Sequence, residues 1–426
     1  MIEQIYLKRV LMRPGLLKRA AGLLMGLALM ASVLFVPAHS SKARQQQVRN
    51  RMENVAGLDS FFRSLTQIKS GRRIEPVRVM HYGDSHTAAD ILTAEIRRSF
   101  QRDFGDGGAG YISARNPFST RRRGVETGTS SGWVMDGVGS SGTNDGIYGL
   151  SGFSISTSRA GESAWLETVC NHFEIYYLRQ PGGGTIDILV DGVSVLDRPL
   201  SLDAAAPAPD YFTYDAPSDS NHRIEIRTTQ PGKTRILGIV TEHIAPGVSY
   251  DVLGINGARA NRLLSWNDTA FVDNLVQRKP DLIIIAYGTN EVTDGDWSVE
   301  SYSRMFANIL KRFRRAAPQA SILVYGPPDR GDVGLAETKM PAMIEAQRRA
   351  AFEVGAAFWN SYAAMGGSGS MSAWVQQGLA QGDRVHLSRD GYIRMGSMFY
   401  NDLLAAYNES RARAPRGTSP PRRRSQ

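Results

Sequence analysis

The segment DLIIIAYGTNE, residues 281–291, decides the fold of this chain. Its apolar stretch up to Tyr287 predicts a strand that is buried on both faces, because a half-exposed strand would alternate apolar with polar residues. Strands of this kind belong to parallel sheets that carry helices on both sides. Active sites in such sheets gather beyond the carboxyl ends of the strands. The sequence therefore places Asn290 where a functional side chain is expected.

Strand and helix patterns alternate on both sides of this segment. Apolar runs predict further strands at residues 77–82, 250–255, 321–325 and 356–359. Helical periodicity predicts helices at residues 88–100, 261–278, 299–315, 337–354 and 388–407. The alternation is typical of a three-layer α/β/α domain with a parallel sheet, which we assign to residues 76–110 and 248–408.

Residues 111–247 interrupt this alternation. Short alternating runs, separated by turn signals such as Asp191-Gly192, predict strands at residues 164–169, 173–178, 185–190, 223–228 and 235–241. The range is therefore expected to form an all-β module inserted into the α/β domain. Two interpretations of the module stay open, a lid on the α/β domain or a substrate-binding module.

The first 40 residues have the pattern of an export signal or a membrane anchor. Five cations lie between Lys8 and Arg19, an uncharged run continues to Val36, and residues 38–40 form a small-x-small triplet typical of a cleavage site. The run is also near the minimum length of a membrane-spanning helix. In either case the body of the protein is expected to be exported, and residues 41–75 to form a tether that leads into the fold.

The positive charge of the chain is confined to its two ends. Of the formal net charge of +9, residues 1–45 contribute +6 and residues 409–426 contribute +5, so the rest of the chain carries −2. A body without basic excess argues against a nucleic-acid partner. The Arg-rich residues 409–426 lack apolar periodicity, and we expect them to be a disordered tail.

The metal-ligating residue types are sparse. Cys170 is the single cysteine, which excludes an intramolecular disulfide and a zinc site built on several thiolates. The seven histidines include no pair at i, i+4 spacing, and no carboxylates cluster beside them. The sequence therefore predicts neither a metal nor a cofactor.

Three short segments carry the residues of a serine hydrolase. Ser85 lies in YGDSHT, residues 82–87, where a predicted strand gives way to a helix whose amino end favours developing negative charge. Asn290 follows the buried strand. In DRVH, residues 383–386, an Asp three residues before a His can orient an imidazole that acts as a general base. Each segment alone also suits a helix cap or a turn, so the prediction depends on their combination.

Together these segments resemble the motif blocks of the SGNH (GDSL-type) hydrolase family. The matching blocks are Gly83-Asp84-Ser85, Gly288-Thr289-Asn290-Glu291 and Asp383-x-x-His386, and the remaining glycine block best matches Gly257, with Gly254 as the alternative. The resemblance covers residues 75–110 and 248–408. It implies a three-layer, flavodoxin-like α/β/α fold.

The resemblance also implies a role for each matched residue. Ser85 would be the nucleophile, His386 the general base, and Asp383 the group that orients His386. The backbone N–H groups of Ser85 and Gly257 and the Asn290 amide would form the oxyanion hole. Asp84 is expected to fix the turn rather than to react.

The sequence departs from the family pattern at two points. His86 stands where a leucine usually follows the nucleophile, and Ala258-Arg259 replaces the polar residue that commonly follows the second-block glycine. These departures leave the shape of the acyl pocket open. We expect His86 to support the site by a hydrogen bond rather than to contact substrate.

The export pattern, the inserted module and the segment GDSHTAAD, residues 83–90, together resemble bacterial O-acetylpeptidoglycan esterases. In those proteins the inserted module is similar to a carbohydrate-binding module. The resemblance implies an enzyme that removes acetyl groups from O-acetylated peptidoglycan through an acetyl-serine. We expect it in the periplasm or cell envelope, and anchored to the inner membrane if the first 40 residues are retained. Three alternatives stay open: a polysaccharide O-acetyltransferase, an esterase for another acetylated polysaccharide, and a non-catalytic glycan-binding protein.

Overall fold

The computed structural model describes residues 51–115, 122–137, 145–331 and 335–413. All of the described residues belong to one compact unit. The predicted export segment therefore lies outside the described residues, as does most of the predicted tail. Among the described residues, no helix combines the length and the apolar character needed to cross a membrane.

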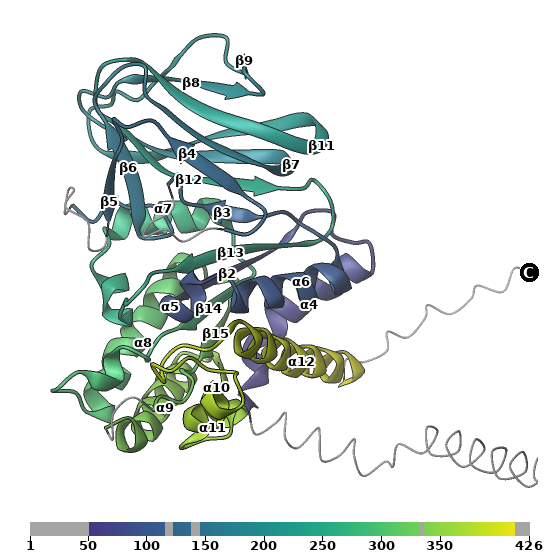
Figure 1. Cartoon of the computed structure of the whole chain (residues 1–426). Helices are drawn as coiled ribbons and strands as arrows, with labels where there is room; N and C mark the ends of the chain where they lie inside the picture. Colours follow the sequence, from purple (N-terminus) through teal and green to yellow (C-terminus); the bar gives the residue numbers. More distant parts are fainter. Residues whose placement is uncertain (1–50, 116–121, 138–144, 332–334, 414–426) are drawn as a thin grey trace, which may run out of the picture. The chain divides into compact units, whose positions relative to one another are not determined.

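The centre of the fold is a six-stranded sheet in the order β1-β16-β15-β14-β2-β13 (Figure 1). All neighbouring strands are parallel except β1, which pairs antiparallel with β16. The strands are β1 (Met52–Glu53), β2 (Val77–Gly83), β13 (Val248–Gly254), β14 (Leu282–Ala286), β15 (Ser321–Tyr325) and β16 (Ala357–Trp359).

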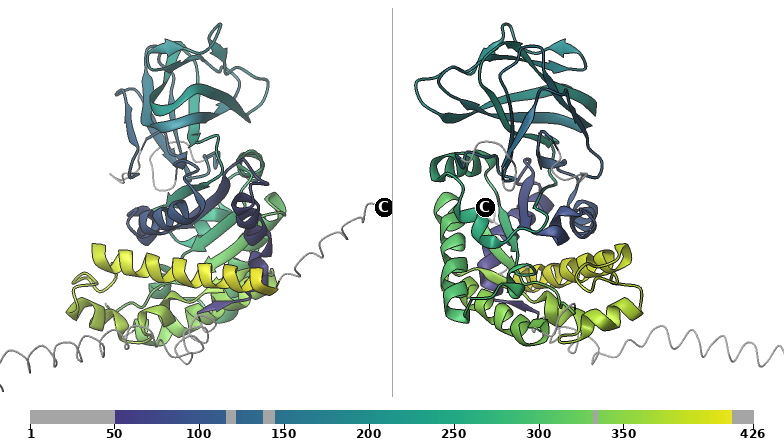
Figure 2. Two further views of the ribbon diagram at one scale, coloured as in Figure 1. Left: turned by 90° about the vertical axis from the view of Figure 1, so that its right-hand side faces the viewer. Right: turned by 60° about the vertical axis from the view of Figure 1, so that its left-hand side comes forward.

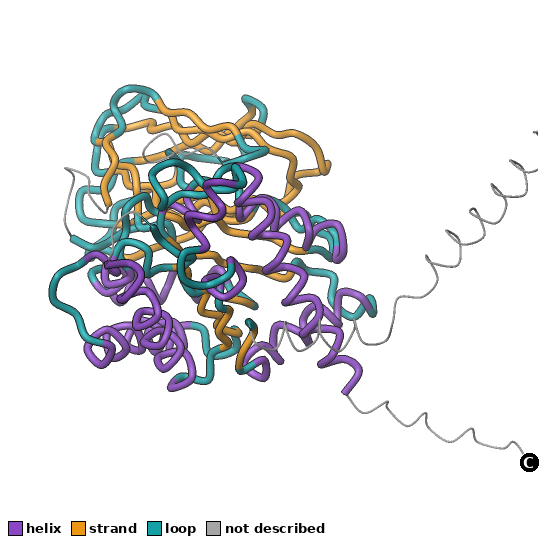
Figure 3. Tube along the Cα trace, turned by 60° about the horizontal axis from the view of Figure 1, so that its bottom comes forward, coloured by secondary structure: helices purple, strands orange, loops and turns teal. Residues whose placement is uncertain are grey.

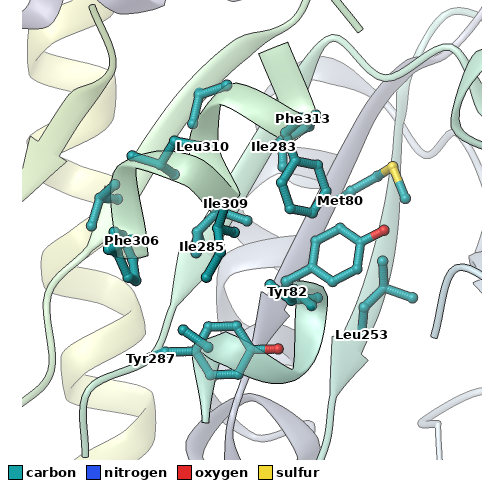
Figure 4. Close-up of a cluster of buried hydrophobic side chains, with 14 of the residues drawn as sticks. Met80, Tyr82, Leu253, Ile283, Ile285, Tyr287, Phe306, Ile309, Leu310 and Phe313 are labelled. Carbon is teal, nitrogen blue, oxygen red and sulfur yellow. The ribbon is translucent and has the colours of Figure 1, made fainter. Parts of the chain in front are cut away.

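Strand β14 shows why this sheet has two covered faces. Its side chains alternate between two hydrophobic cores, with Ile283 and Ile285 in one core and Leu282 and Ile284 in the other. All four are fully buried. Because successive side chains of a strand point to opposite faces, an unbroken apolar run requires a cover on each face. Figure 4 shows the first of these cores, in which side chains of β2, β13 and β14 pack against α8 (Val299–Ala316).

Helices cover both faces, which confirms the predicted three-layer α/β/α architecture. One face packs against α7 (Asp268–Arg278), α8 (Val299–Ala316) and α9 (Leu335–Glu353). The other packs against α4 (Asp59–Lys69), α6 (Leu92–Phe104), α10 (Ser361–Met365), α11 (Ser370–Gln376) and α12 (Arg389–Arg413). Figure 2 shows α8 and α12 on opposite sides of the sheet, and Figure 3 shows the same layering of helices around strands.

The prediction of a tether over residues 41–75 is wrong for residues 51–69. These residues form β1, the 3-10 helix Val55–Leu58 and α4, and they belong to the core. Phe61, Phe62 and Leu65 are at most 2 % exposed. Their i, i+1, i+4 spacing is the amphipathic pattern of a helix that packs on one side, so this helix is a layer of the fold and not a connection to it.

Two predicted helices are interrupted in the structure. The helix expected at 88–100 is α5 (Ser85–Ala88) followed by α6, because Asp90 adopts a positive φ of 42° between them. The helix expected at 261–278 is the 3-10 helix Ala260–Leu264 followed by α7, which starts at the Asn267 cap. The predicted tail also begins too early, since α12 continues to Arg413.

The inserted range forms an antiparallel sheet in the order β10-β8-β11-β7-β12-β6-β5. In addition, β3 pairs with β12, β4 with β7 and β9 with β8. The two runs expected at 164–169 and 173–178 are one long strand, because no turn separates them. The strands are β3 (Gly110–Ile112), β4 (Glu126–Thr129), β5 (Val134–Gly137), β6 (Phe153–Thr157), β7 (Ser163–Arg179), β8 (Thr185–Val190), β9 (Val193–Ser194), β10 (Leu200–Ser201), β11 (Ala208–Gln230) and β12 (Thr234–Glu242).

A buried charge network fixes this module to the α/β domain. Arg278 of α7 donates to both carboxylate oxygens of Asp251 in β13, at 2.8 Å each, and to Glu242 of β12 at 2.6 Å. Glu242 also pairs with Arg78 of β2 at 2.8 Å. Although burial opposes it, the two arginines lower the pKa of Glu242 to about 2. These buried ion pairs couple the module to the α/β domain, and both interpretations of the module, a lid or a substrate-binding module, stay open.

Candidate active site

Ser85 is presented by the turn between β2 and α5. Gly83 ends the strand, and a side chain there would collide with Thr87 and with the carbonyl oxygen of Ala286. Asp84 caps the helix, since its side chain accepts a hydrogen bond from the His86 N–H at 3.0 Å. This agrees with the prediction that Asp84 fixes the turn. Ser85 is the first helical residue, and N–H groups in a first helical turn have no acceptor within the helix.

The structure brings Ser85, His386 and Asp383 together in a chain of hydrogen bonds. Ser85 Oγ lies 2.9 Å from His386 Nε2, and His386 Nδ1 lies 2.7 Å from Asp383 Oδ2. This is the order of contacts that nucleophile, base and orienting carboxylate require. The catalytic roles of the three residues stay a prediction, which the geometry supports.

The loop before α12 holds Asp383 in place. Its Oδ1 accepts hydrogen bonds from the N–H groups of Val385 and His386, at 3.0 Å each. Although partial burial opposes it, these bonds and the His386 side chain lower the pKa of Asp383 to about 2. Asp383 is therefore an anion throughout the neutral range, where it can stabilise a positively charged imidazole.

The predicted oxyanion donors follow β13 and β14, the two strands that flank β2 in the sheet. Asn290 follows β14, and its Nδ2 donates to the carbonyl oxygen of Ala258 at 2.9 Å. A carboxamide nitrogen carries two hydrogens, so the second remains available to a ligand. Gly257 lies in the loop after β13 with φ +70°, in open space. The donors thus belong to loops that contact each other.

Gly254, the alternative to Gly257, has a packing role. It is the last residue of β13, and a Cβ there would lie 2.2 Å from the backbone nitrogen of Ala88 in α5. We expect Gly254→Ala to lower the free energy of unfolding by about 3 kcal/mol, because the clash is with backbone and cannot be relieved by a rotamer change.

Gly257→Ala provides the matched comparison. Its Cβ would meet no heavy atom within 4 Å, so only the left-handed backbone conformation is penalised, by about 1–2 kcal/mol. Urea unfolding of the two variants measures the difference. A Gly254→Ala protein as stable as Gly257→Ala would contradict this assignment of the two glycines.

His86 makes the supporting hydrogen bond expected of it. It is 7 % exposed, and its Nδ1 lies 2.9 Å from the hydroxyl of Tyr392 in α12. Its ring also packs against that of His386, with centroids 5.6 Å apart. Burial lowers the pKa of His86, in opposition to the charge of Asp84. Sequence reasoning missed Tyr392, because nothing in the sequence relates a residue of the last helix to the nucleophile turn.

The loop after β15 is a second feature that the sequence did not indicate. Arg330 donates from Nη1 to the carbonyl oxygen of Thr289 at 2.6 Å. The next residue, Gly331, donates its N–H to the carbonyl oxygen of Arg384 at 2.9 Å. The loop therefore connects the Asn290 segment to the segment that carries Asp383 and His386.

Arg259 and Glu291 also join the two oxyanion loops. The Arg259 guanidinium pairs with both carboxylate oxygens of Asp294, at distances of 2.6 to 3.0 Å. Glu291 is buried between the loops and accepts backbone N–H groups from both. No group of three or more His, Cys, Asp or Glu side chains within the described ranges could hold a metal ion.

A family model matches part of the chain. The model of the GDSL-like Lipase/Acylhydrolase family matches residues 227–394, which include Gly257, Asn290, Asp383 and His386. A search of curated proteins found no match.

Solved structures give the second comparison. The chain is 25 % identical to a peptidoglycan O-acetylesterase, with a TM-score of 0.71 over 84 % of this chain and 99 % of that one. Two further matches have TM-scores too low to indicate a shared overall fold. They are a family two carbohydrate esterase from Cellvibrio japonicus (14 % identity, 67 % and 98 % of the two chains, TM-score 0.29) and one from Corynascus thermopiles (13 %, 59 % and 96 %, TM-score 0.31). The chain therefore contains a GDSL-like lipase/acylhydrolase (SGNH-type) domain and is an esterase, with a fold similar to that of a peptidoglycan O-acetylesterase.

Proposed function

We propose that this esterase removes O-acetyl groups from peptidoglycan through an acetyl-enzyme formed on Ser85. The observation that carries the proposal is the hydrogen-bonded chain Ser85–His386–Asp383, in a fold that matches a peptidoglycan O-acetylesterase over 84 % of its length. The match covers nearly all of that neighbour, so it extends beyond the α/β core.

In the first half-reaction, Ser85 Oγ attacks the carbonyl carbon of the acetyl group while His386 Nε2 takes the hydroxyl proton. Asp383 stabilises the imidazolium that forms. The negative charge that develops on the carbonyl oxygen is held by the N–H groups of Ser85 and Gly257 and by the Asn290 amide. When the tetrahedral intermediate collapses, the bond to the sugar oxygen breaks, and His386 returns its proton to that oxygen.

In the second half-reaction, water attacks the acetyl group on Ser85. His386 takes a proton from the water, and the same three donors hold the oxyanion. Collapse of this intermediate breaks the bond to Ser85 Oγ, which receives the proton from His386. The products are acetate and the free enzyme, and no group beyond the chain and water is consumed.

The exposure of the site suits a polymer-borne acetyl group. The side chain of His386 is 37 % exposed and that of Asp383 is 46 % exposed. A bulky glycan can therefore approach the triad from solvent while only its acetyl group reaches Ser85. A site that served a long acyl chain would instead need an apolar channel around that chain.

We also infer that the inserted module contributes to glycan binding and that the enzyme acts outside the cytoplasm, in the periplasm or cell envelope. The similarity of the whole fold to a peptidoglycan esterase supports the first inference. The cation-rich, then apolar, first 40 residues support the second.

A comparison of substrates tests which ester is cleaved. Acetate release would be measured on O-acetylated peptidoglycan, on acetylated xylan and on 4-nitrophenyl acetate, at equal concentrations of acetyl groups. We expect the highest kcat/KM on peptidoglycan. A higher kcat/KM on xylan would assign the enzyme to another polysaccharide, and transfer of acetyl to an added sugar acceptor in place of acetate release would identify a transferase.

Replacement of Asn290 by alanine tests the oxyanion hole. The variant loses one donor to the developing oxyanion, which is expected to lower kcat by about a hundredfold to a thousandfold. KM is expected to change little, because the lost interaction is strongest in the transition state. Initial rates on 4-nitrophenyl acetate measure both constants. An unchanged kcat would remove Asn290 from the oxyanion hole.

A further inference from the structure

We propose that Glu291 is a positioning residue that holds the two loops of the oxyanion hole in register. The proposal rests on the proposed function, because it concerns the donors that this function assigns to Gly257 and Asn290. It adds a residue to which neither the motif comparison nor the sequence gave a role.

The Glu291 carboxyl bridges the two loops directly. Its Oε1 accepts the N–H of Ala260 at 2.7 Å, and its Oε2 accepts the N–H of Gly288 at 3.1 Å. Ala260 begins the 3-10 helix that directly follows the Gly257 loop, and Gly288 lies in the same turn as Asn290. One side chain therefore fixes the separation of the segments that carry two of the three proposed donors.

The loops also hold the Asn290 amide itself. Asn290 Nδ2 donates to the carbonyl oxygen of Ala258, which lies next to Gly257. A shift of the Ala258 loop would therefore turn the amide away as well as move Gly257. Removal of the Glu291 bridge is thus expected to displace both donors, the Gly257 N–H and the Asn290 amide, from the oxyanion.

Side chains of α8 and α9 hold the Glu291 carboxyl in place from the core side. The hydroxyl of Tyr302 lies 3.3 Å from Glu291 Oε1, and Gln347 Nε2 lies 3.3 Å from that hydroxyl and 2.8 Å from the carbonyl oxygen of Tyr287. The carboxyl therefore has a fixed place in the core.

Glu291 is buried with no cation of the described residues at ion-pair distance, and Arg259 acts on its charge only from further away. Glu291 is 4 % exposed, and no lysine or arginine of the described segments forms an ion pair with it. Asp90, Asp251 and Glu242 are also buried, but each pairs with an arginine within 3.0 Å. Burial raises the pKa of Glu291 to about 7, although the N–H groups of Ala260 and Gly288 oppose the shift. Groups shifted in this way are concentrated at functional sites.

Glu291→Gln is the decisive variant because it removes one acceptor and keeps the size of the side chain. The amide oxygen can accept one backbone N–H, but the amide nitrogen cannot accept the other. One loop is then released. A displacement of about 1 Å in a catalytic group costs about a hundredfold in rate, so we expect kcat to fall tenfold to a hundredfold with KM nearly unchanged.

A double-mutant cycle separates positioning from a merely structural role. Kinetics on 4-nitrophenyl acetate at pH 8 would be compared for wild type, Glu291→Gln, Asn290→Ala and the double variant. If Glu291 acts through the oxyanion donors, its replacement costs much less in the Asn290→Ala background than in wild type. The proposal would be overturned if the kcat loss of the double variant equalled the product of the two single losses, or if Glu291→Gln kept the wild-type kcat.

Asp402→Asn is the matched control for loss of a buried carboxylate. Asp402 accepts from Arg51 and from Trp359 Nε1, well inside α12. The variant is expected to lower the melting temperature and leave kcat near the wild-type value. If Glu291→Gln fails to fold, Glu291→Asp replaces it in the cycle, because its shorter carboxylate reaches only one loop. An inactive wild type would instead refute the proposed function.

Discussion

Ser85→Ala and His386→Ala are each expected to lower kcat on 4-nitrophenyl acetate by about ten-thousandfold to a millionfold. Without the Ser85 hydroxyl no acetyl-enzyme forms, and without His386 the hydroxyl, 2.9 Å from its Nε2, keeps its proton. Because the two residues act in one step, the double variant is expected to be no slower than either single variant.

Thermal unfolding provides the control for these variants. Ser85 and His386 are only partly buried, so neither substitution opens a cavity in the core, and melting temperatures close to wild type are expected. Near wild-type turnover in either variant would refute the assignment of nucleophile and base. Multiplicative losses in the double variant would show that the two side chains act independently.

Asp383→Asn is expected to lower kcat by about ten-thousandfold. The carboxylate of Asp383 accepts from His386 Nδ1 at 2.7 Å, which leaves Nε2 free to take the serine proton. An asparagine amide can present its N–H there and reverse the tautomer. The Asp383 carboxylate also stabilises the imidazolium, which a neutral amide does not do.

The pH dependence of activity provides a second measurement on Asp383. Its folded pKa, about 2, is lower than that of an unpaired aspartate, so the contribution of its negative charge to stability is present at neutral pH and is lost as the pH falls toward 2. The charge is therefore constant between pH 6 and 9. The activity ratio of wild type to Asp383→Asn is expected to stay large over that range, and a ratio near one would exclude the orienting role.

The central strands could be predicted because their apolar composition fits only a strand that is buried on both faces. The run that ends at Tyr287 is apolar throughout, and only a strand covered on both faces buries it. The triad segments were found because each follows or precedes a regular element at the same edge of the sheet. The placement of Ser85 and Asn290 at one edge follows because parallel strands bring their carboxyl ends together. Asp383 and His386 reach that edge on the loop before α12, which the motif indicated but the strand pattern did not.

Other features could not be read from the sequence because they depend on distant contacts. Residues 51–69 carry the amphipathic spacing of Phe61, Phe62 and Leu65, but which part of the fold covers these side chains is seen only from their packing into the core. The long strand β7 looks like two runs because its burial changes along its length. Its pairing with β11 is what makes it continuous.

The supporting residues of the site show the same limit. Tyr392 contacts His86, and Arg330 contacts the carbonyl oxygen of Thr289. Neither position has a distinctive local pattern. The position of Glu291, in the turn that follows a buried strand, indicates that its carboxylate needs hydrogen-bond donors from the protein. Which two N–H groups it accepts becomes visible only with the fold.

Acetate release from O-acetylated peptidoglycan, by wild type and by Ser85→Ala, tests the central claim most directly. The same peptidoglycan stripped of its acetyl groups by mild base is the matched control substrate. The account predicts that wild type releases acetate from the acetylated polymer alone and that Ser85→Ala releases none above the uncatalysed rate. Absence of release by wild type, or equal release by Ser85→Ala, would contradict it.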